Sequence, residues 1–271
     1  MHVWTCAVDK TYSAHARQLL AMAKFSVVTP IRNEAKLLPY SLPSIFRLKP
    51  DEVILIFDRC TDKSHEIAKR IARRFEYGSR TRFIELNKPS QRWKFRVAFL
   101  RRRGFKLAKN NVILNTDADM VLDEKIVNYL HRVDKKALGV LLFSRKPYPR
   151  TFQSFVGILV SKLAPLGFGF GALYAFSREA WLETEDQESA RKVHRAEDTH
   201  LVSSISKKYK TIFIKTNTLH LRHRETAKNH FMKGVTRWQA KRAPLWEVAI
   251  HSFMYLRPLV LSGYLKARLK S

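Results

Sequence analysis

The stretch that decides the fold is Asn111-Asn-Val-Ile-Leu-Asn-Thr-Asp-Ala-Asp-Met-Val-Leu-Asp123. Its apolar residues 112–114 are typical of a short buried strand, and they lead directly into Asp117-Ala-Asp119. Open α/β sheets bind ligands just outside the carboxyl ends of their strands. Side chains two residues apart on an extended segment point the same way, so both carboxylates can face one cation. Such oxygens suit Mg²⁺ or Mn²⁺, which complete their coordination with phosphate and water.

A simpler interpretation exists for the same carboxylates. Asp119 or Asp123 could only cap a following helix, because an aspartate oxygen accepts hydrogen bonds from the first free N–H groups of a helix. The stretch alone does not separate a metal ligand from a helix cap. The rest of the chain has to decide between them.

The composition of the chain points to a folded protein with an anionic partner. Its 271 residues suffice for one large α/β domain or two small ones, and its aromatic and apolar content argues against disorder. The net charge is +28, from 51 Lys and Arg against 23 Asp and Glu. Such an excess of positive charge indicates an anionic partner, and the three candidates are nucleic acid, an anionic membrane face and a phosphorylated substrate.

The cysteines and the first residues bear on the compartment. Cys6 and Cys60 are the two cysteines, which is too few for a disulfide framework or a zinc pattern and favours a reducing, cytoplasmic location. Residues 1–24 have no pattern typical of a secretory signal, and we interpret them as an N-terminal extension.

Strands and helices alternate between residues 25 and 115. This order predicts a mainly parallel sheet with helices on both faces. The expected strands cover residues 25–30, 51–57, 82–86 and 112–114, and the expected helices cover residues 35–46, 64–77 and 95–109.

The pattern is less regular after Asp123. We expect a helix at residues 126–133, strands at 138–144, 172–176 and 211–215, a solvated acidic loop at 183–188 and a helix that begins at 196–202. The apolar segment 155–176 is long enough to be considered as a membrane span. Pro165 and the three glycines of 167–171 argue against a continuous spanning helix, and a helix followed by a glycine loop fits better.

The last segment, residues 226–271, differs in character from the rest. Residues 228–242 are basic, and residues 244–265 are rich in large apolar side chains. We expect one or two basic amphipathic helices that lie on an anionic membrane surface. The alternative, that these helices pack back on the core, remains equally open.

Basic residues are concentrated before the deciding stretch. Between Leu86 and Thr116 there are nine Lys or Arg and no acid. Lys94, with its neighbours Arg92 and Arg96, could complement a nucleoside diphosphate. The run at residues 101–103 is expected to be a solvated basic helix face.

Other polar residues stand where strands end or helices begin. Asp58 follows the second strand, where it could accept a hydrogen bond from a base or ribose or could only bond its own turn. Glu197-Asp198 stands at a helix start, where it could stabilise that end or deprotonate an attacking hydroxyl. His220 and His223 follow the strand at 211–215 and could ligate a metal, contact phosphate or be structural.

Five motifs in this order resemble the family 2 glycosyltransferases of GT-A fold, over about residues 25 to 223. They are Phe25-Ser-Val-Val-Thr-Pro-Ile-Arg-Asn-Glu34, Asp58-Arg-Cys-Thr-Asp-Lys-Ser64, Asp117-Ala-Asp119, residues 171–178 and Glu197-Asp198. The resemblance implies a GT-A (Rossmann-like) α/β domain at residues 25–225. Its nucleotide-binding half would be 25–123 and its acceptor half 124–225.

The resemblance also implies roles for individual residues. Asp119 would be the chief ligand of Mg²⁺ or Mn²⁺ in a DXD motif, and Asp117 would approach the ribose or the metal. Asp198 would be the base that activates the acceptor, supported by Glu197. The resemblance gives Asp123 no role, and we interpret it as an ordinary helix-start residue. The nucleotide pocket would be lined by Pro30, Asn33, Glu34 and Asp58.

The resemblance therefore implies an inverting, metal-dependent glycosyltransferase. Its donor would be a UDP or GDP sugar, and its acceptor a glycan, a small molecule or a lipid-linked group near the cytoplasmic face of a membrane. One alternative is a nucleotidyltransferase that uses the same Asp-x-Asp metal site. Another is a non-enzymatic basic protein that binds nucleic acid, although no helix-turn-helix, zinc or aromatic-platform pattern supports it.

Overall fold

The computed structural model describes residues 24–88, 95–134, 138–147, 173–192, 197–221, 227–239, 243–254 and 257–269. The chain divides into two compact units. The described residues from 24 to 146 and from 173 to 221 belong to the first unit, and the helices after residue 226 belong to the second. The N-terminal extension, up to residue 23, and the expected helix and glycine loop before residue 173 lie outside the described residues.

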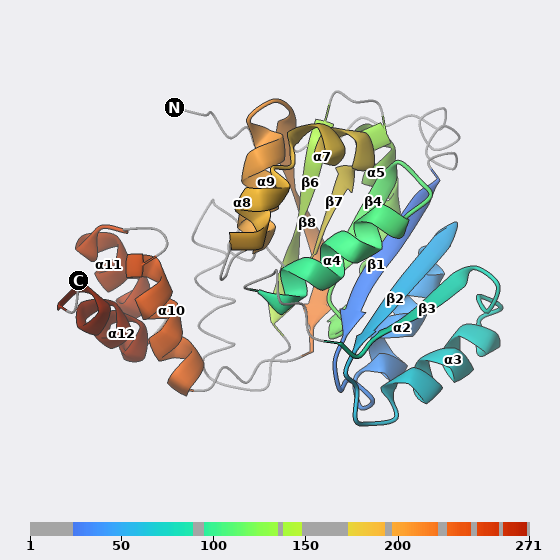
Figure 1. Cartoon of the computed structure of the whole chain (residues 1–271), viewed down its shortest axis with the longest axis horizontal. Coiled ribbons are helices and arrows are strands. Elements are labelled where there is room, and N and C mark those ends of the chain that lie inside the picture. The colour runs from blue at the N-terminus through green and yellow to red at the C-terminus, as the bar shows by residue number, and fades with distance from the viewer. Residues whose placement is uncertain are drawn as a thin grey trace. The chain divides into compact units, whose positions relative to one another are not determined.

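The first unit is built on an eight-stranded sheet (Figure 1). Its strand order is β3-β2-β1-β4-β7-β6-β8-β5. The strands are β1 (Phe25–Ile31), β2 (Glu52–Asp58), β3 (Thr81–Leu86), β4 (Val112–Thr116), β5 (Met120–Val121), β6 (Leu138–Pro147), β7 (Leu173–Ser177) and β8 (Lys210–His220).

The pairing of the strands changes from parallel to antiparallel at β4. β1 pairs in parallel with β2 and β4, and β2 with β3, so this half has the parallel order expected from the sequence. Beyond β4 the pairing is antiparallel. Strand β7 pairs with both β4 and β6, and β5 pairs with β8. The expected α/β class, with helices on both faces of the sheet, is confirmed, and the second half of the sheet is antiparallel.

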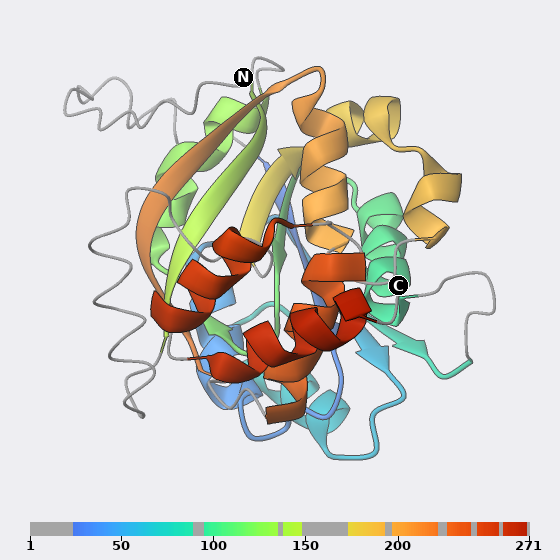
Figure 2. The same ribbon diagram turned by 90° about the vertical axis from the view of Figure 1, so that its left-hand side faces the viewer.

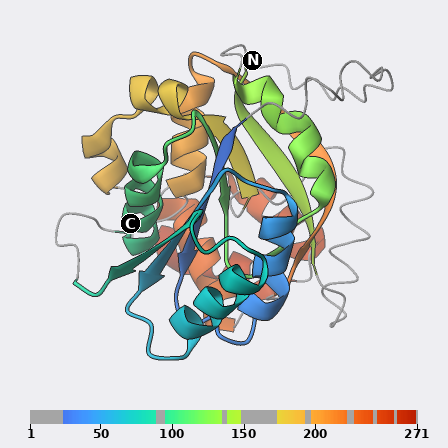
Figure 3. The same ribbon diagram turned by 90° about the vertical axis from the view of Figure 1, so that its right-hand side faces the viewer.

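Helices cover both faces of the sheet, as Figure 3 shows for its parallel half. Helices α2 (Leu38–Arg47), α3 (Ser64–Arg74) and α5 (Val127–Asp134) pack on one face, with the short 3₁₀ helix η1 (Glu124–Ile126) before α5. Helices α4 (Arg96–Leu107), α7 (Arg178–Thr184) and α9 (Glu197–Ser206) pack on the other, and α8 (Gln187–Lys192) precedes α9.

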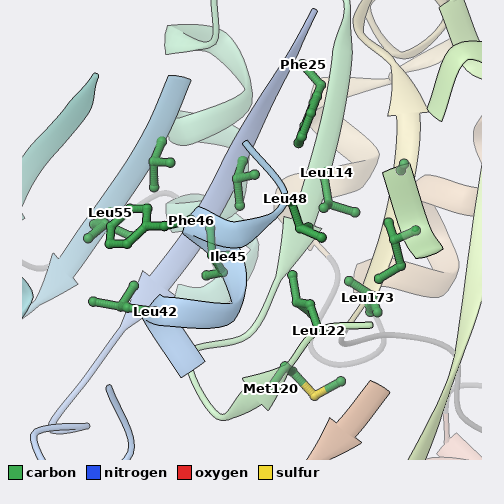
Figure 4. Packing of buried hydrophobic residues seen from close by; sticks show 14 of the residues in the cluster. Phe25, Leu42, Ile45, Phe46, Leu48, Leu55, Leu114, Met120, Leu122 and Leu173 are labelled. Atoms are coloured by element: carbon green, nitrogen blue, oxygen red, sulfur yellow. The ribbon is translucent and has the colours of Figure 1, made fainter. Parts of the chain in front are cut away.

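The core explains why these segments are strands. Every residue of β2 is buried, as expected for a central parallel strand that is covered on both faces. Leu55 joins Leu42 and Phe46 of α2 on one face (Figure 4), and Ile54 and Ile56 pack with Leu100 and Phe105 of α4 on the other. The two apolar layers fix the carboxyl ends of β1, β2 and β4 at one edge.

Two expectations about the acceptor half are wrong in detail. The segment 183–188 is not a solvated loop, because it contains the end of α7 and the start of α8, and the side chain of Glu185 between them is buried. The strand expected at 211–215 runs from Lys210 to His220. His220 is therefore the last residue of β8 rather than a loop residue, and it lies opposite Met120 of β5.

The second unit contains α10 (Ala227–Gln239), α11 (Leu245–Met254) and α12 (Pro258–Leu269), rather than one or two helices (Figure 2). Its small core is formed by Ala243, Val248, Val260 and Tyr264. The hydroxyl of Tyr264 donates a 2.7 Å hydrogen bond to the carbonyl of Ala243. In the part of the chain that the structure describes, no helix is long and apolar enough to cross a membrane.

Candidate active site

The candidate site lies where β1, β2 and β4 end, because parallel strands bring their carboxyl ends to the same edge. Pro30 is paired in register with Ile56 of β2, and the pairing of β1 with β4 stops at Val28. A proline lacks the N–H group that a strand between two partners needs. Pro30 is therefore placed beyond the pairing with β4.

The loops after β1 and β2 are joined by side-chain hydrogen bonds. Asn33 has a φ of 54°. Its side-chain oxygen accepts a 2.8 Å hydrogen bond from the backbone N–H of Thr61, and its side-chain nitrogen donates a 3.1 Å hydrogen bond to the Thr61 hydroxyl. The backbone N–H of Glu34 donates a 2.7 Å bond to Ser64 Oγ. The amide of Asn33 thus holds the two loops together, and the carboxylate of Glu34 is buried beside them.

Asp62 reinforces this connection. Its carboxylate accepts bonds from the backbone N–H groups of Ala35 and Ser64, both at 3.0 Å, and from the Ser64 hydroxyl at 2.5 Å. Partial burial acts to raise the pKa of Asp62, but these hydrogen bonds outweigh it and lower the pKa below its usual value. The charged form of Asp62 therefore stabilises the loops.

Asp58 is the buried last residue of β2. Its carboxylate forms ion pairs with Arg96 at 2.9 Å and with Arg59 at 3.1 Å. Arg96 also donates a 2.9 Å bond to the carbonyl of Leu86 at the end of β3. Asp58 is therefore held at the strand edge, and the cation predicted to face a diphosphate, Arg96, faces this carboxylate.

The two carboxylates of Asp117-Ala-Asp119 have different bonded partners. Asp117 follows β4 directly and forms an ion pair with Arg101 of α4. Asp119 is mostly buried, and its Oδ2 lies 3.2 Å from Nε2 of His220. The carbonyl of Asp119 also accepts a 2.8 Å bond from the N–H of Leu221. The antiparallel pairing of β5 and β8 therefore brings Asp119 and His220 together.

Arg101 connects the two carboxylate motifs. Its guanidinium bonds Asp117 through Nη2 and Glu197 at the start of α9 through Nη1. The side chains of Arg101 and Glu197 are both almost fully buried. One cation thus holds together the end of β4 and the beginning of α9.

The interpretation of residues 101–103 as a solvated face is wrong for two of the three. Arg101 and Arg102 are buried, and Arg103 is exposed. Arg102 Nε donates a 2.7 Å bond to Glu185, whose second oxygen accepts from the indole of Trp181. A buried cation requires such a partner, and the sequence positions of Glu185 and Glu197 gave no direct indication that they supply it.

The burial of this cluster alters its proton affinities. Burial alone would lower the pKa of Arg101, but its attraction to Asp117 and Glu197 raises it, so the guanidinium stays charged. Burial raises the pKa of Glu197, against the effect of Arg101, and the nearby Asp198 adds to the increase. Burial likewise raises the pKa of Tyr174 in β7, so its hydroxyl stays neutral.

Glu197 and Asp198 have separate surroundings although they are adjacent. Glu197 points to Arg101, whereas Asp198 is partly exposed and its Oδ1 accepts a 2.7 Å bond from the N–H of Thr199. Both lie in the first turn of α9, where negative charge is favourable. Asp198 is thus the one of the two that a molecule from solution can reach.

Asp119 and His220 are the described residues that fit a divalent metal. A carboxylate oxygen next to an imidazole nitrogen is a donor pair that Mn²⁺ accepts, and phosphate and water can supply the other ligands. Among the described residues, no group of three or more His, Cys, Asp or Glu side chains is arranged to hold a metal by itself. Lys94 and His223, which were also expected at the site, lie outside the described residues.

Asp123 has the ordinary role expected for it. Its Oδ1 accepts a 3.0 Å bond from the N–H of Lys125, which caps the short helix η1. Its Oδ2 accepts a 2.7 Å bond from the N–H of Asn217 in β8. Asp123 therefore stabilises the segment that follows the candidate site.

Known proteins resemble this chain in sequence over part of its length and in overall fold. Residues 26–157 match the model of the family described as glycosyl transferase family 2. No curated protein matches the sequence. Among solved structures, a mannosyltransferase from Pyrobaculum calidifontis in complex with GDP-Man and Mn²⁺ is similar in fold, with 20% identity, a TM-score of 0.59, and coverage of 93% of this chain and 79% of that chain.

Two further structures have the same fold. Glucosyl-3-phosphoglycerate synthase from Mycobacterium tuberculosis, in complex with Mn²⁺, UDP and phosphoglyceric acid, is 17% identical with a TM-score of 0.54, and the similarity covers 83% of this chain and 77% of that chain. TarS from Staphylococcus aureus, in complex with UDP-GlcNAc, is 14% identical with a TM-score of 0.55, and the similarity covers 80% of this chain and 67% of that chain. At these identities the likeness concerns the fold.

Proposed function

We propose that the chain is an inverting, metal-dependent glycosyltransferase that uses a UDP or GDP sugar as its donor. The match of residues 26–157 to glycosyl transferase family 2 supports sugar transfer. The observation that carries the proposal is the bond of one buried cation, Arg101, to both Asp117 and Glu197. It joins the strand end expected to hold the donor to the helix start expected to activate the acceptor.

The donor would bind at the edge formed by β1, β2 and β4. Pro30 lies near the end of β1, Asn33 and Glu34 follow that strand, and Asp58 ends β2. A nucleotide binds at this place in sheets of this type. The bonds between Asn33 and Thr61 hold the two loops in one arrangement before any ligand arrives. Such preorganisation lowers the entropy that is lost on binding.

Asp119, with His220 beside it, would hold Mg²⁺ or Mn²⁺, and Asp117 would face the ribose or the same cation. The bound cation would supply Lewis-acid stabilisation of the negative charge that develops on the diphosphate. Asp119 directly precedes β5, and His220 is the last residue of β8. Because β5 and β8 are paired, the sheet sets the distance between these two side chains. The mannosyltransferase and synthase structures of this fold contain Mn²⁺, which supports the assignment.

Asp198 would remove the proton from an acceptor hydroxyl. Its partial exposure suits this role, and the buried Glu197, bonded to Arg101, would keep the start of α9 in place. A general base must reach the proton that it abstracts, and Asp198 is the accessible carboxylate of the pair. An acceptor that is already ionised, such as a lipid phosphate, would need no base.

We place the acceptor among glycans, small molecules and lipid-linked groups, and the protein in the cytoplasm, peripheral to the cytoplasmic face of a membrane. The charge of +28 supports an anionic surface as a partner. The family match supports sugar transfer rather than nucleotidyl transfer or nucleic-acid binding.

The base assignment can be tested with the Asp198→Asn variant. We expect sugar transfer to fall on the order of 100-fold or more, the usual contribution of general-base catalysis, while calorimetry gives an unchanged Kd for UDP or GDP. The matched control is Asp186→Asn, which changes an exposed carboxylate at the start of α8 and should leave both quantities unchanged. Loss of nucleotide binding in Asp198→Asn would contradict a role as base. Release of pyrophosphate from a nucleoside triphosphate would instead indicate a nucleotidyltransferase.

A further inference from the structure

One side of helix α11 consists of large apolar side chains that are exposed. Trp246 is 66% exposed, Ile250 52% and Phe253 82%. Their spacing of four and three residues places them on one stripe of the helix. The opposite side of α11 packs inward through Val248 and Ser252, which are buried.

Exposed aromatic groups at this density need an explanation. A single exposed apolar residue is ordinary, but a contiguous apolar patch on a protein marks an interaction surface. Helix α12, which packs beside α11 in the same unit (Figure 2), adds the exposed Leu265 and Leu269. Exposed large apolar side chains therefore occur on both α11 and α12.

The charge of the same unit indicates which partner covers this surface. Lys233, Lys266 and Arg268 are exposed on α10 and α12. Over residues 222–271 the cations greatly outnumber the acids. The cations are Arg222, Arg224, Lys228, Lys233, Arg237, Lys241, Arg242, Arg257, Lys266, Arg268 and Lys270, and the acids are Glu225 and Glu247.

We propose that the stripe Trp246, Ile250 and Phe253 is a docking surface for an anionic lipid bilayer. Aromatic and aliphatic groups would enter the headgroup region, and the basic side chains of the unit would pair with lipid phosphates. A second copy of this chain is a poorer occupant, because it would bring an equal positive charge to the same interface.

The dimensions of α11 agree with shallow insertion. A ten-residue helix is about 15 Å long, half the thickness of the hydrocarbon core of a bilayer. The helix therefore lies in the plane of the interface, with its buried side against the rest of the unit. This mode of binding deepens the peripheral location proposed above and does not depend on the chemistry of sugar transfer.

The test is sedimentation of the full-length protein with vesicles of phosphatidylglycerol and phosphatidylcholine. We expect the wild type to pellet with anionic vesicles, weakly with neutral ones, and less as salt increases. The triple variant W246S/I250S/F253S should bind anionic vesicles about tenfold more weakly or worse. The control is Y40S/L182S, which removes two exposed apolar side chains of the sheet unit and should bind as the wild type does.

A spectroscopic variant locates the insertion. Vesicles should shift the tryptophan emission of the wild type to shorter wavelength, and W246F should bind equally well with most of that shift lost. Unchanged melting temperatures establish that the variants are folded.

The proposal is wrong if the wild type binds no anionic vesicles or if the triple variant binds them as the wild type does. It is also wrong if gel filtration finds a dimer that the triple variant converts to a monomer without any lipid binding. In that case the stripe is an interface between copies. Because none of these measurements uses a sugar donor, they can fail while the glycosyltransferase assignment holds, and the reverse is equally true.

Discussion

Asp117 and Glu197 are bonded to the same guanidinium, that of Arg101. Asp117 follows the central strand β4, and Glu197 begins α9, so a helix on one face of the sheet supplies the cation that joins them. The attraction of one buried cation to two carboxylates offsets the cost of removing Arg101 and Glu197 from water. The relative position of the donor and acceptor motifs therefore depends on a residue that is expected to contact neither substrate.

We predict that Arg101→Ala lowers the rate of sugar transfer at least 100-fold. Removal of the cation leaves Glu197 buried without its partner, which typically costs about 3–5 kcal/mol. Arg101→Lys restores a charge but not the two-pronged geometry, so we expect an intermediate rate. The measurement is kcat and KM for a nucleotide sugar in each variant.

Arg103→Ala is the matched control, because Arg103 is the exposed arginine of the same run. It should leave the rate and the melting temperature within error of the wild type. If Arg101→Ala folds and turns over at the wild-type rate, the proposed positioning role is wrong. A lower melting temperature with full activity would indicate a structural role only.

Gly263→Ala should destabilise the helical unit. A methyl group on Gly263 would lie 2.0 Å from the carbonyl oxygen of Phe231, which is backbone and cannot move aside. Forcing the helices apart typically costs about 1–3 kcal/mol, and thermal or urea unfolding would measure it. Gly78→Ala is the control, because no atom lies within 4 Å of a methyl group there. Equal stability of the two variants would contradict the close packing of α10 and α12.

Asp62→Ala should lower the free energy of unfolding by about 1 kcal/mol at pH 7, since it removes hydrogen bonds on a solvent-screened surface. The pKa of Asp62 is lowered in the folded protein from its usual 3.8. Its stabilisation is therefore present above pH 3.8 and is lost as the pH falls through the lower, folded-state pKa. Urea unfolding from pH 7 to pH 3 should find that the difference between wild type and variant shrinks in acid. Asp62→Asn keeps an acceptor without charge and should show a weaker pH dependence. A difference that grows in acid would contradict the assignment.

The parallel half of the sheet could be predicted from the sequence because its strands are buried on both faces. The continuous apolar run of β2 has this pattern, and it carries Asp58 to the sheet edge. Asp117 and Asp119 could be located in the same way, since they directly follow a strand. The local sequence was sufficient to predict the position of a residue wherever that residue directly followed a single strand.

Long-range pairing could not be predicted in the same way. The contact of Asp119 with His220 requires β5 and β8 to be antiparallel neighbours, and nothing in residues 211–223 specifies that partner. The burial of Arg101 was the opposite case, because a signal was present. It stands three residues after Ala98 and four before Phe105 on the buried face of α4, and helical spacing would have placed it there.

The central claim is that Asp117-Ala-Asp119 is the metal-dependent donor site of a glycosyltransferase. The most direct measurement is the release of nucleoside diphosphate from GDP and UDP sugars in the presence of Mn²⁺, comparing the wild type with Asp119→Ala. We predict release by the wild type that EDTA abolishes, and a loss on the order of 100-fold or more in the variant, because the diphosphate leaves without Lewis-acid stabilisation. Undiminished release by Asp119→Ala would contradict the claim.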